Sequence, residues 1–209
     1  MNVDVERVAG ALRTNCFEAF VADDAGHAGE IILTEIVPEV APETVSFGDS
    51  MTLIATGALD AFRRDPSVRF IDTYEDGVER AEILKRRRHA LLSDLFFTGT
   101  SAVTADGKLV NLDMVGNRVA GLVYGPRHVV VTVGVNKIVP DLDAAMARIR
   151  ETAAPLNAKR HGSATPCAKT GECMDCKSPD RICNVWTITE KSWPKGRIRV
   201  ILITENLGL

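Results

Sequence analysis

The feature that most constrains the fold of this chain is a short apolar run from His128 to Val133, HVVVTV. Its β-branched residues and the preceding turn dipeptide Gly125-Pro126 predict a strand that is buried on both faces. Strands of that kind occur mainly in parallel sheets, because helices cover both sides of such sheets. The run therefore indicates an α/β protein.

Helices and strands alternate along the rest of the chain, as the spacing of apolar residues indicates. Helices are predicted over residues 3–14, 25–37, 51–62, 76–93 and 141–153, with Pro38 and Pro42 ending the second. Strands are predicted over 17–21, 44–47, 68–71, 185–189 and 198–203. This alternation predicts an open α/β fold, with a mainly parallel sheet and helices on both faces.

Two turns predict local pairing of strands. Asp106-Gly107 lies between residues 101–104 and 108–111 and is a strong hairpin signal. Pro194-Lys195-Gly196 predicts a turn that joins the last two strands as a small hairpin or edge pair. With 209 residues the chain fits one domain, in which residues 1–160 form the α/β core. Residues 161–209 then complete the same domain with a cysteine-rich loop and the C-terminal strands.

Composition and charge narrow the classes of partner. The formal net charge of −3 argues against nucleic acid or an anionic membrane as the main partner. No run approaches 18 apolar residues, so no membrane span is predicted. The N-terminal residues lack a basic region followed by an apolar run, so no signal peptide is expected. A cytoplasmic, reducing environment is therefore the expected location.

A polar loop near the C-terminus contains four cysteines, Cys167, Cys173, Cys176 and Cys183, with the spacing C-x5-C-x2-C-x6-C. In a reducing compartment, clustered cysteines favour a metal site over disulfides. Structural zinc often uses two close cysteine pairs, whereas iron–sulfur clusters accept irregular outer spacings around one C-x2-C. The pattern therefore favours an iron–sulfur cluster over zinc. Both stay open, as does a disulfide pair or free thiols in a loop. Exposure to air can also strip a labile cluster and leave disulfides.

Polar and small residues gather at the predicted strand ends in residues 48–50 and 98–118. Open α/β sheets bind ligands at the carboxyl ends of their strands, so these residues are the candidate ligand-binding set. The alternative is that they serve only as turn residues and as an ordinary helix cap. The set comprises Gly48, Ser50, Thr98, Gly99, Thr100, Ser101, Asn111, Asp113, Asn117 and Arg118.

The predicted helix 76–93 is rich in basic residues, including the run Lys85-Arg86-Arg87-Arg88. Four successive positions point in different directions on a helix, and no aromatic residues interleave with them to stack bases. A solvated helix face is therefore the preferred interpretation, in place of a nucleic-acid or phosphate site.

Several segments together resemble the lactate-utilisation (LUD) domain family, in a branch with a C-terminal four-cysteine motif. They include TGTSAVTADGKLVNLDMVGNRVA at 98–120 and TPCAKTGECMDCKSPDRICNVW at 165–186. The resemblance implies an open α/β fold similar to the sugar-phosphate isomerase and CoA-transferase-like superfamily. It also implies a link with the oxidation of lactate or a related hydroxy acid, in which related proteins work in complexes that carry iron–sulfur clusters.

Three functions are consistent with these observations. The first is an accessory or electron-transfer component of hydroxy-acid oxidation, with a cluster on the four cysteines and redox proteins as partners. The second is an enzyme that binds a small phosphate- or CoA-type ligand in the crevice. The third is a regulatory module with structural zinc. Whether the chain catalyses a reaction of its own stays open, and so does assembly as a homo-oligomer.

Overall fold

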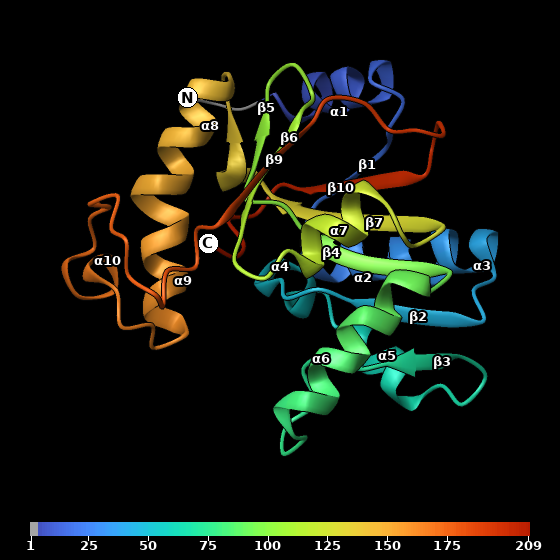
Figure 1. Cartoon of the computed structure of the whole chain (residues 1–209). Helices are drawn as coiled ribbons and strands as arrows, with labels where there is room; N and C mark the ends of the chain where they lie inside the picture. The colour runs from blue at the N-terminus through green and yellow to red at the C-terminus, as the bar shows by residue number, and fades with distance from the viewer. Residues whose placement is uncertain (1–3) are drawn as a thin grey trace.

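Six parallel strands form the main sheet of the computed structural model, which describes residues 4–209 (Figure 1). Each pair of neighbouring strands in this sheet runs parallel. The predicted α/β fold with an open, mainly parallel sheet is thereby confirmed. In sheet order the strands are β1 (Glu18–Ala22), β10 (Ile198–Ile203), β7 (His128–Gly134), β4 (Leu95–Gly99), β2 (Thr44–Phe47) and β3 (Arg69–Ile71).

The apolar run of 128–133 forms β7, near the middle of this sheet, and its prediction as a strand buried on both faces is confirmed. Val129 and Val131 pack into one hydrophobic cluster, whereas Val130 packs into another on the opposite face. All six residues of β10 are buried as well. Their alternate side chains divide between the same two clusters, because successive side chains of a strand point to opposite faces.

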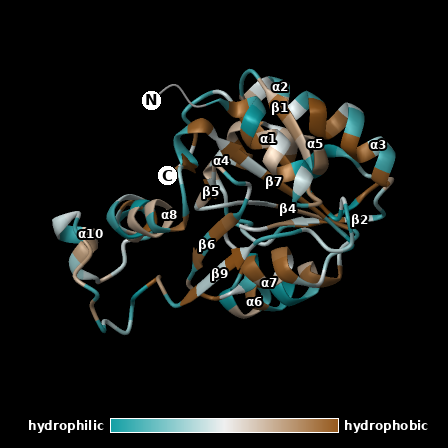
Figure 2. Ribbon diagram, turned by 90° about the horizontal axis from the view of Figure 1, so that it is seen from above, coloured by the Kyte–Doolittle hydropathy of each residue, from teal (hydrophilic) through white to brown (hydrophobic). Residues whose placement is uncertain are grey.

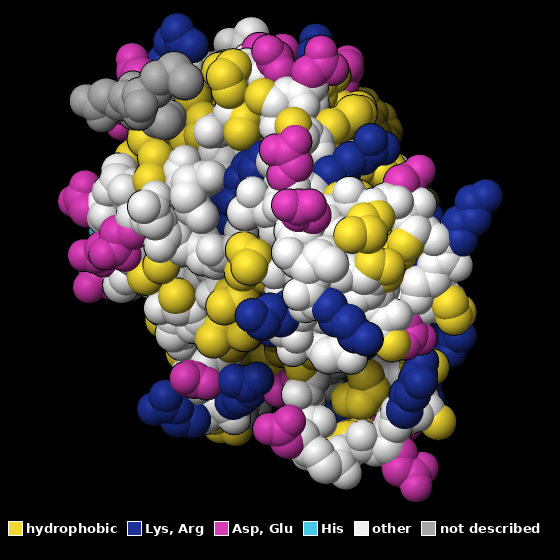
Figure 3. All heavy atoms as spheres, turned by 90° about the vertical axis from the view of Figure 1, so that its left-hand side faces the viewer, with side chains coloured by type: hydrophobic (Ala, Val, Ile, Leu, Met, Phe, Trp, Pro, Cys, Tyr) yellow, Lys and Arg dark blue, Asp and Glu magenta, His cyan; other side chains and the backbone are white. Residues whose placement is uncertain are grey.

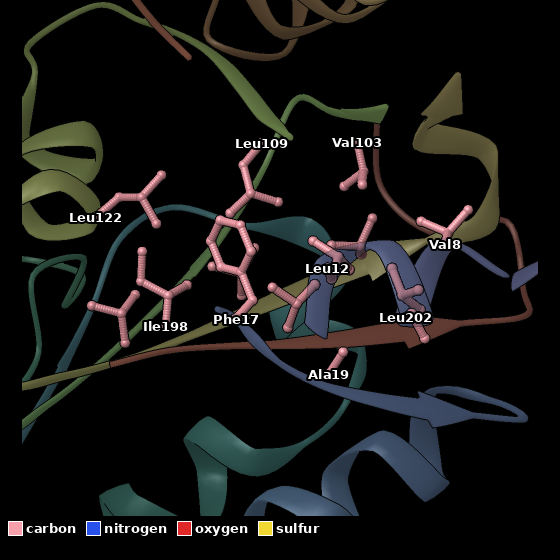
Figure 4. Packing of buried hydrophobic residues seen from close by; sticks show 14 of the residues in the cluster. Val8, Leu12, Phe17, Ala19, Val103, Leu109, Leu122, Ile198 and Leu202 are labelled. Carbon is pink, nitrogen blue, oxygen red and sulfur yellow. The ribbon is translucent and has the colours of Figure 1, made fainter. Parts of the chain in front are cut away.

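Helices cover both faces of the sheet (Figure 2). On one face, α1 (Val5–Thr14) and α7 (Asn117–Val123) pack with residues of the hairpin, and Figure 4 shows Val8, Leu12, Leu109 and Leu202 meeting there. The other face is covered by a helical run, namely α2 (Ala25–Ile31), a π-helical turn (Ile32–Ile36), α3 (Val37–Val40), α4 (Met51–Ala55) and α5 (Ala58–Arg64). A further helix, α6 (Arg80–His89), continues into a 3-10 turn (Ala90–Leu92).

A second, mixed sheet contains the order β8 (Ile138–Val139), β5 (Ala102–Thr104), β6 (Leu109–Asp113) and β9 (Val185–Thr189). The antiparallel pairing of β5 with β6 confirms the hairpin predicted at Asp106-Gly107. Val103 and Leu109 join the core of the main sheet, whereas Val110 and Leu112 face α8 (Leu142–Arg148). The second sheet is therefore a layer between the main sheet and the C-terminal helices.

The predicted pairing of the last two strands is wrong. β9 pairs antiparallel with β6 at the edge of the second sheet, whereas β10 inserts between β1 and β7. The burial of each strand explains the difference. All residues of β10 are buried, so it needs neighbours on both sides and layers on both faces, whereas β9 has exposed residues and suits an edge.

Two predicted helix ends are also wrong, because proline does not stop either helix. A π-helical turn precedes α3, which carries Pro38 in its first turn. In the same way a π-helical turn (Ile149–Ala153) precedes α9 (Ala154–Arg160), which carries Pro155 in its first turn. The residues before each proline are already helical, so each proline lies inside a continuous helical run, and the wider π-helical turn before it accommodates the ring. The last predicted helix therefore extends to Arg160.

Other boundaries differ in smaller ways. Gly57 has a φ of 72° and divides the predicted helix 51–62 into α4 and α5. Helix α6 begins only at Arg80 instead of residue 76. The predicted start of the first helix at residue 3 lies outside the described residues, and α1 begins at Val5 behind the N-cap residue Asp4. Across residues 4–209, every helix is too short or too polar to span a membrane.

The hairpin turn gives a test of the packing between the second sheet and α1. Gly107 has a φ of +81°, and a Cβ there would lie 2.7 Å from the backbone of Ala11 and Leu12. We expect Gly107→Ala to lower the free energy of unfolding by roughly 1–3 kcal/mol. Gly10→Ala, on α1 with open space around it, is the control and should raise it by about 0.5–1 kcal/mol. Urea unfolding of both variants and the unmodified protein measures these changes. If Gly107→Ala is as stable as the unmodified protein, the close approach of Gly107 to the backbone of Ala11 and Leu12 is contradicted.

Candidate functional site

A cavity of about 480 Å³ lies at the carboxyl ends of the parallel strands, bordered by the second sheet and α9. Most of the candidate ligand-binding residues line it, namely Ser50, Gly99, Thr100, Ser101, Asp113, Asn117 and Arg118. The other three lie behind that wall. Thr98 is buried in β4, Asn111 accepts a hydrogen bond from the backbone N–H of Ser101, and Gly48 lies against Arg118.

Two glycines at strand ends allow the wall to pack this tightly. A Cβ on Gly99, the last residue of β4, would lie 2.5 Å from the hydroxyl oxygen of Ser50. A Cβ on Gly48, directly after β2, would lie 2.6 Å from Cγ of Arg118. Ser50 in turn caps α4, since its hydroxyl accepts from the N–H of Leu53 at 3.2 Å. The strand ends, Ser50 and Arg118 therefore form one close-packed surface.

Asp113, at the end of β6, holds Arg118 in the wall of the cavity. Its buried carboxylate accepts hydrogen bonds from the backbone N–H groups of Met114, Arg118 and Val119, at 2.9 to 3.3 Å. The guanidinium of Arg118 lies 3.3 Å from the same carboxylate. Because the Asp113 carboxylate is already hydrogen-bonded to these donors, its main role here is to orient the guanidinium of Arg118.

Lys137 has the most perturbed environment in this wall. It follows β7, is 5% exposed, and donates from Nζ to the hydroxyl oxygen of Thr52 at 3.0 Å. Burial, followed by the positive charges of Arg148 and Arg118, lowers the pKa of Lys137 from 10.5 to about 7. Within residues 4–209 it has no ion pair with a carboxylate. A substantial share of Lys137 is therefore a neutral amine near pH 7.

Arg80 and Arg87 of α6 also line the cavity. Arg80 is exposed, as expected for a solvated helix face, whereas Arg87 is half-buried, so that interpretation is wrong for Arg87. The guanidinium of Arg87 lies 4.6 Å from the ring centroid of Tyr74, another residue of the wall. Burial raises the pKa of the Tyr74 hydroxyl. The sequence contained a usable signal, since positions seven apart lie on the same side of a helix. Lys85 and Arg88 are exposed, as expected.

The C-terminal end of α9 lies at the rim of the cavity, where Arg160 contacts Asp49. Arg160 forms hydrogen bonds with both carboxylate oxygens of Asp49 and with Asn157. His161 lies beside them, with Nε2 3.3 Å from the Asp49 carboxylate. Arg160 and His161 are far from Asp49 in the sequence. No local pattern could have placed them together.

The four cysteines of the C-terminal loop line a second, smaller cavity of about 40 Å³. Cys167, Cys173, Cys176 and Cys183 are all free thiols. Among residues 4–209, no three His, Cys, Asp or Glu side chains are arranged to hold a single metal ion. The loop therefore gathers the thiols around one space without bringing three of them to the separation that one ion requires.

Arg181 lies against this group of cysteines. It donates to the carbonyl oxygens of Cys176 and Cys183, at 2.8 and 3.0 Å. The pKa of Arg181 is raised, chiefly by its hydrogen bond and charge interaction with Cys183. Its Nε is buried and has no hydrogen-bond partner. A positive charge and a free N–H donor thus adjoin the thiols.

The two cavities share part of their walls, although the sequence alone leaves their separation open. Leu112, Ala154 and Ile182 line both. Ile182 directly precedes Cys183, and Leu112 directly precedes Asp113. Figure 1 shows α9 and α10 (Pro166–Thr170) on the same side of the molecule. On that face, acidic and basic side chains are interspersed over the outer surface (Figure 3).

Comparisons with known proteins agree with this architecture. The family model described as LUD domain matches residues 5–203. A crystal structure of a DUF162 family protein from Deinococcus radiodurans is similar with a TM-score of 0.52 and 13% identity, over 95% of each chain. This likeness concerns the fold. No curated protein matches the sequence.

Similarity to translation initiation factors is weaker. The eIF-2B structure from Pyrococcus horikoshii OT3 has a TM-score of 0.32 and 14% identity, over 92% of this chain and 60% of that one. The eIF2B beta structure from Chaetomium thermophilum has a TM-score of 0.28 and 14% identity, over 66% of this chain and 43% of that one.

Burial of Lys137 predicts a dependence of stability on pH. Between about pH 7 and 10.5 the unfolded chain carries a proton on Lys137 that the folded chain lacks. The free energy of unfolding should therefore rise with pH in this window, by at most about 1.4 kcal/mol per pH unit. Lys137→Met lacks this contribution, so its stability relative to the unmodified protein should fall as pH rises.

Urea unfolding at several pH values from 6.5 to 10 measures this difference. Lys85→Met, at an exposed position of α6, is the matched control, and its difference from the unmodified protein should stay nearly constant. If Lys137→Met and Lys85→Met show the same pH dependence, Lys137 is not perturbed by burial.

Proposed function

Because the chain belongs to the LUD domain family, we propose that this lactate-utilisation-type protein is a redox component in the oxidation of lactate or a related hydroxy acid. In this proposal Cys167, Cys173, Cys176 and Cys183 hold an iron–sulfur cluster. The observation that carries the proposal is that all four thiols line one cavity and none is in a disulfide. The cluster, when bound, supplies one-electron exchange.

The chemistry of the donor set fits such a group. Thiolates are soft ligands that suit iron–sulfur clusters and zinc. A cluster of several irons separates its cysteine ligands further than one ion does, which suits thiols that surround a space without converging on one point. The guanidinium of Arg181 places a positive charge beside Cys176 and Cys183, and its unpartnered Nε is available to an anionic group.

The surroundings of the thiols also favour a redox role. Trp186, Leu112 and Ile182 line the cysteine cavity and limit the access of water from the side of the second sheet. Apolar cover and N–H donors near sulfur are the features by which proteins tune the potential of a cluster. Trp193, the other tryptophan, is 87% exposed and does not take part.

A second candidate function, the binding of a small anionic molecule, is favoured by the larger cavity. Its wall contains several cationic side chains, and it shares Leu112, Ala154 and Ile182 with the wall of the cysteine cavity. A ligand bound there would therefore lie next to the wall of the cysteine cavity. The two candidate functions are therefore compatible within one protein.

Metal analysis of protein purified without oxygen tests the cluster. We expect a brown protein that contains iron and sulfide, with visible absorption that a reductant bleaches. Cys176→Ser should lose most of the iron. Cys16→Ser should keep it, because Cys16 lies outside the cysteine cavity. A colourless, iron-free protein would contradict the proposal, and one zinc per chain would instead support the structural-zinc module.

Arg181 provides a test of the redox role that does not depend on enzymatic activity. Its positive charge should favour the reduced, more negative state of the cluster. We therefore expect Arg181→Gln to lower the midpoint potential, as measured by potentiometric titration of the visible absorption. Arg64→Gln removes an exposed charge from α5, outside both cavities, and should leave the potential unchanged. An equal potential in all three proteins would place Arg181 away from the cluster.

A further inference from the structure

We propose that the larger cavity binds a small organic molecule with two separate anionic groups, one held by Lys137 and Arg118 and the other by Arg80 and Arg87. This inference rests on the second candidate function, in which the cavity binds a small molecule. It goes further by giving the ligand's charge and length, and by assigning a role to a helix that sequence patterns place in solvent.

The first argument is the imbalance of charge in the cavity wall. Its cationic side chains are Arg80, Arg87, Arg118, Lys137 and Arg160, and its acidic side chains are Asp49 and Asp113. The last residue, Leu209, also lines the cavity. Both aspartate carboxylates already have partners, because Arg160 binds Asp49 and Arg118 binds Asp113. In the part of the chain that the structure describes, Lys137, Arg80 and Arg87 have no ion pair with a carboxylate.

The inner group of charges surrounds Lys137. A buried ammonium without a counter-charge is costly, and a bound anion offsets that cost. Thr52 contributes only a neutral hydroxyl, and the nearest charges, Arg118 and Arg148, are positive. The hydroxyl groups of Ser50 and Ser101 line the same cavity and are available to an anionic oxygen, whereas that of Thr100 donates to the carbonyl oxygens of Ala102 and Val110. The inner end therefore has the donors that a carboxylate or a phosphate needs.

The outer group of charges belongs to α6. Nε of Arg87 is buried and has no hydrogen-bond partner, while its guanidinium is held over the ring of Tyr74. A guanidinium fixed in this way loses little side-chain freedom when it pairs with an anion. Arg80 lies two turns earlier on the same helix and lines the same cavity. A planar pair of oxygens, from a carboxylate or a phosphate, matches the fork of each arginine.

The two groups come from separate elements. Arg118 belongs to α7 and Lys137 follows β7, whereas Arg80 and Arg87 belong to α6, and all four side chains line the one cavity. A volume of about 480 Å³ is in the range of cavities that hold metabolites. A molecule with one carboxylate, such as lactate, would leave the cations of α6 without a partner.

The same geometry predicts that binding is coupled to a proton. Lys137 holds an anion only in its protonated form, so affinity should fall about tenfold for each pH unit above the pKa of about 7. The charged groups that act on Lys137 from the neighbouring elements are Arg148 of α8 and Arg118 of α7. His161 at the rim is a further titratable group in the wall.

Calorimetric titration of the full chain at pH 6.5 tests the proposal with three probes. Malate carries two carboxylates, 3-phosphoglycerate carries a phosphate and a carboxylate, and lactate carries one carboxylate. We expect at least one of the first two to bind tenfold or more tightly than lactate. The comparison of malate with 3-phosphoglycerate distinguishes a carboxylate from a phosphate at the second position.

Variants locate the two anionic groups. Arg87→Met should weaken binding of the tighter probe at least tenfold, and should leave lactate affinity nearly unchanged. Arg88→Met is the matched control on the same helix, exposed to solvent, and should have no effect. Lys137→Met should weaken the binding of the tighter probe and of lactate. Lys137→Arg keeps the charge and should bind with no fall in affinity between pH 7 and 9, even if its affinity is lower overall.

The outcomes distinguish failure of the two-anion proposal from failure of small-molecule binding, the candidate function on which it rests. Lactate binding as tight as that of both larger probes, or no effect of Arg87→Met on the larger probe, overturns the two-anion proposal and leaves small-molecule binding intact. The absence of heat with all three probes overturns both. The metal content of the cysteine loop is measured independently, so neither result bears on the cluster.

Discussion

The cavity depends on close packing where three neighbouring parallel strands end. Gly48 follows β2, Gly99 ends β4 and Gly134 ends β7, and a Cβ on any of them would overlap a neighbouring atom. The absence of side chains lets Ser50, Arg118 and the chain segment at Leu207 approach the strand ends. Ser50 and Arg118 can therefore pack directly against the strand ends and form part of the cavity wall at the carboxyl edge of the sheet.

Charge at this edge follows from the same packing. The tight wall buries Lys137 next to Arg118 and leaves it without a carboxylate, which an enclosed anion would supply. This cationic cavity and the cysteine cavity share Leu112 of the second sheet, Ala154 and Ile182 in their walls. The proposed anion site and the thiol-lined site therefore share part of one wall, an arrangement suited to a protein that couples ligand binding with redox change.

Prediction from sequence succeeded where local patterns determine local structure. The apolar run of β7 and the Asp106-Gly107 hairpin have signatures that do not depend on distant residues. It failed where the partner is remote. The turn at residues 194–196 suggested a hairpin, yet β10 pairs with β1 and β7 because a strand apolar on both faces gains more burial inside the main sheet.

The sequence by itself determined the class of fold, the strand ends that contribute polar residues, and the presence of four cysteines in one loop. Hydrophobic periodicity and residue type predict these properties, because both depend only on residues that are close together in the sequence. Only the tertiary structure decided that Arg87 and Arg160 join Lys137 around one cavity, and that this cavity adjoins the cysteines. Side chains on separate elements meet only after the sheet order and the burial of each face are established, and no local pattern records that order.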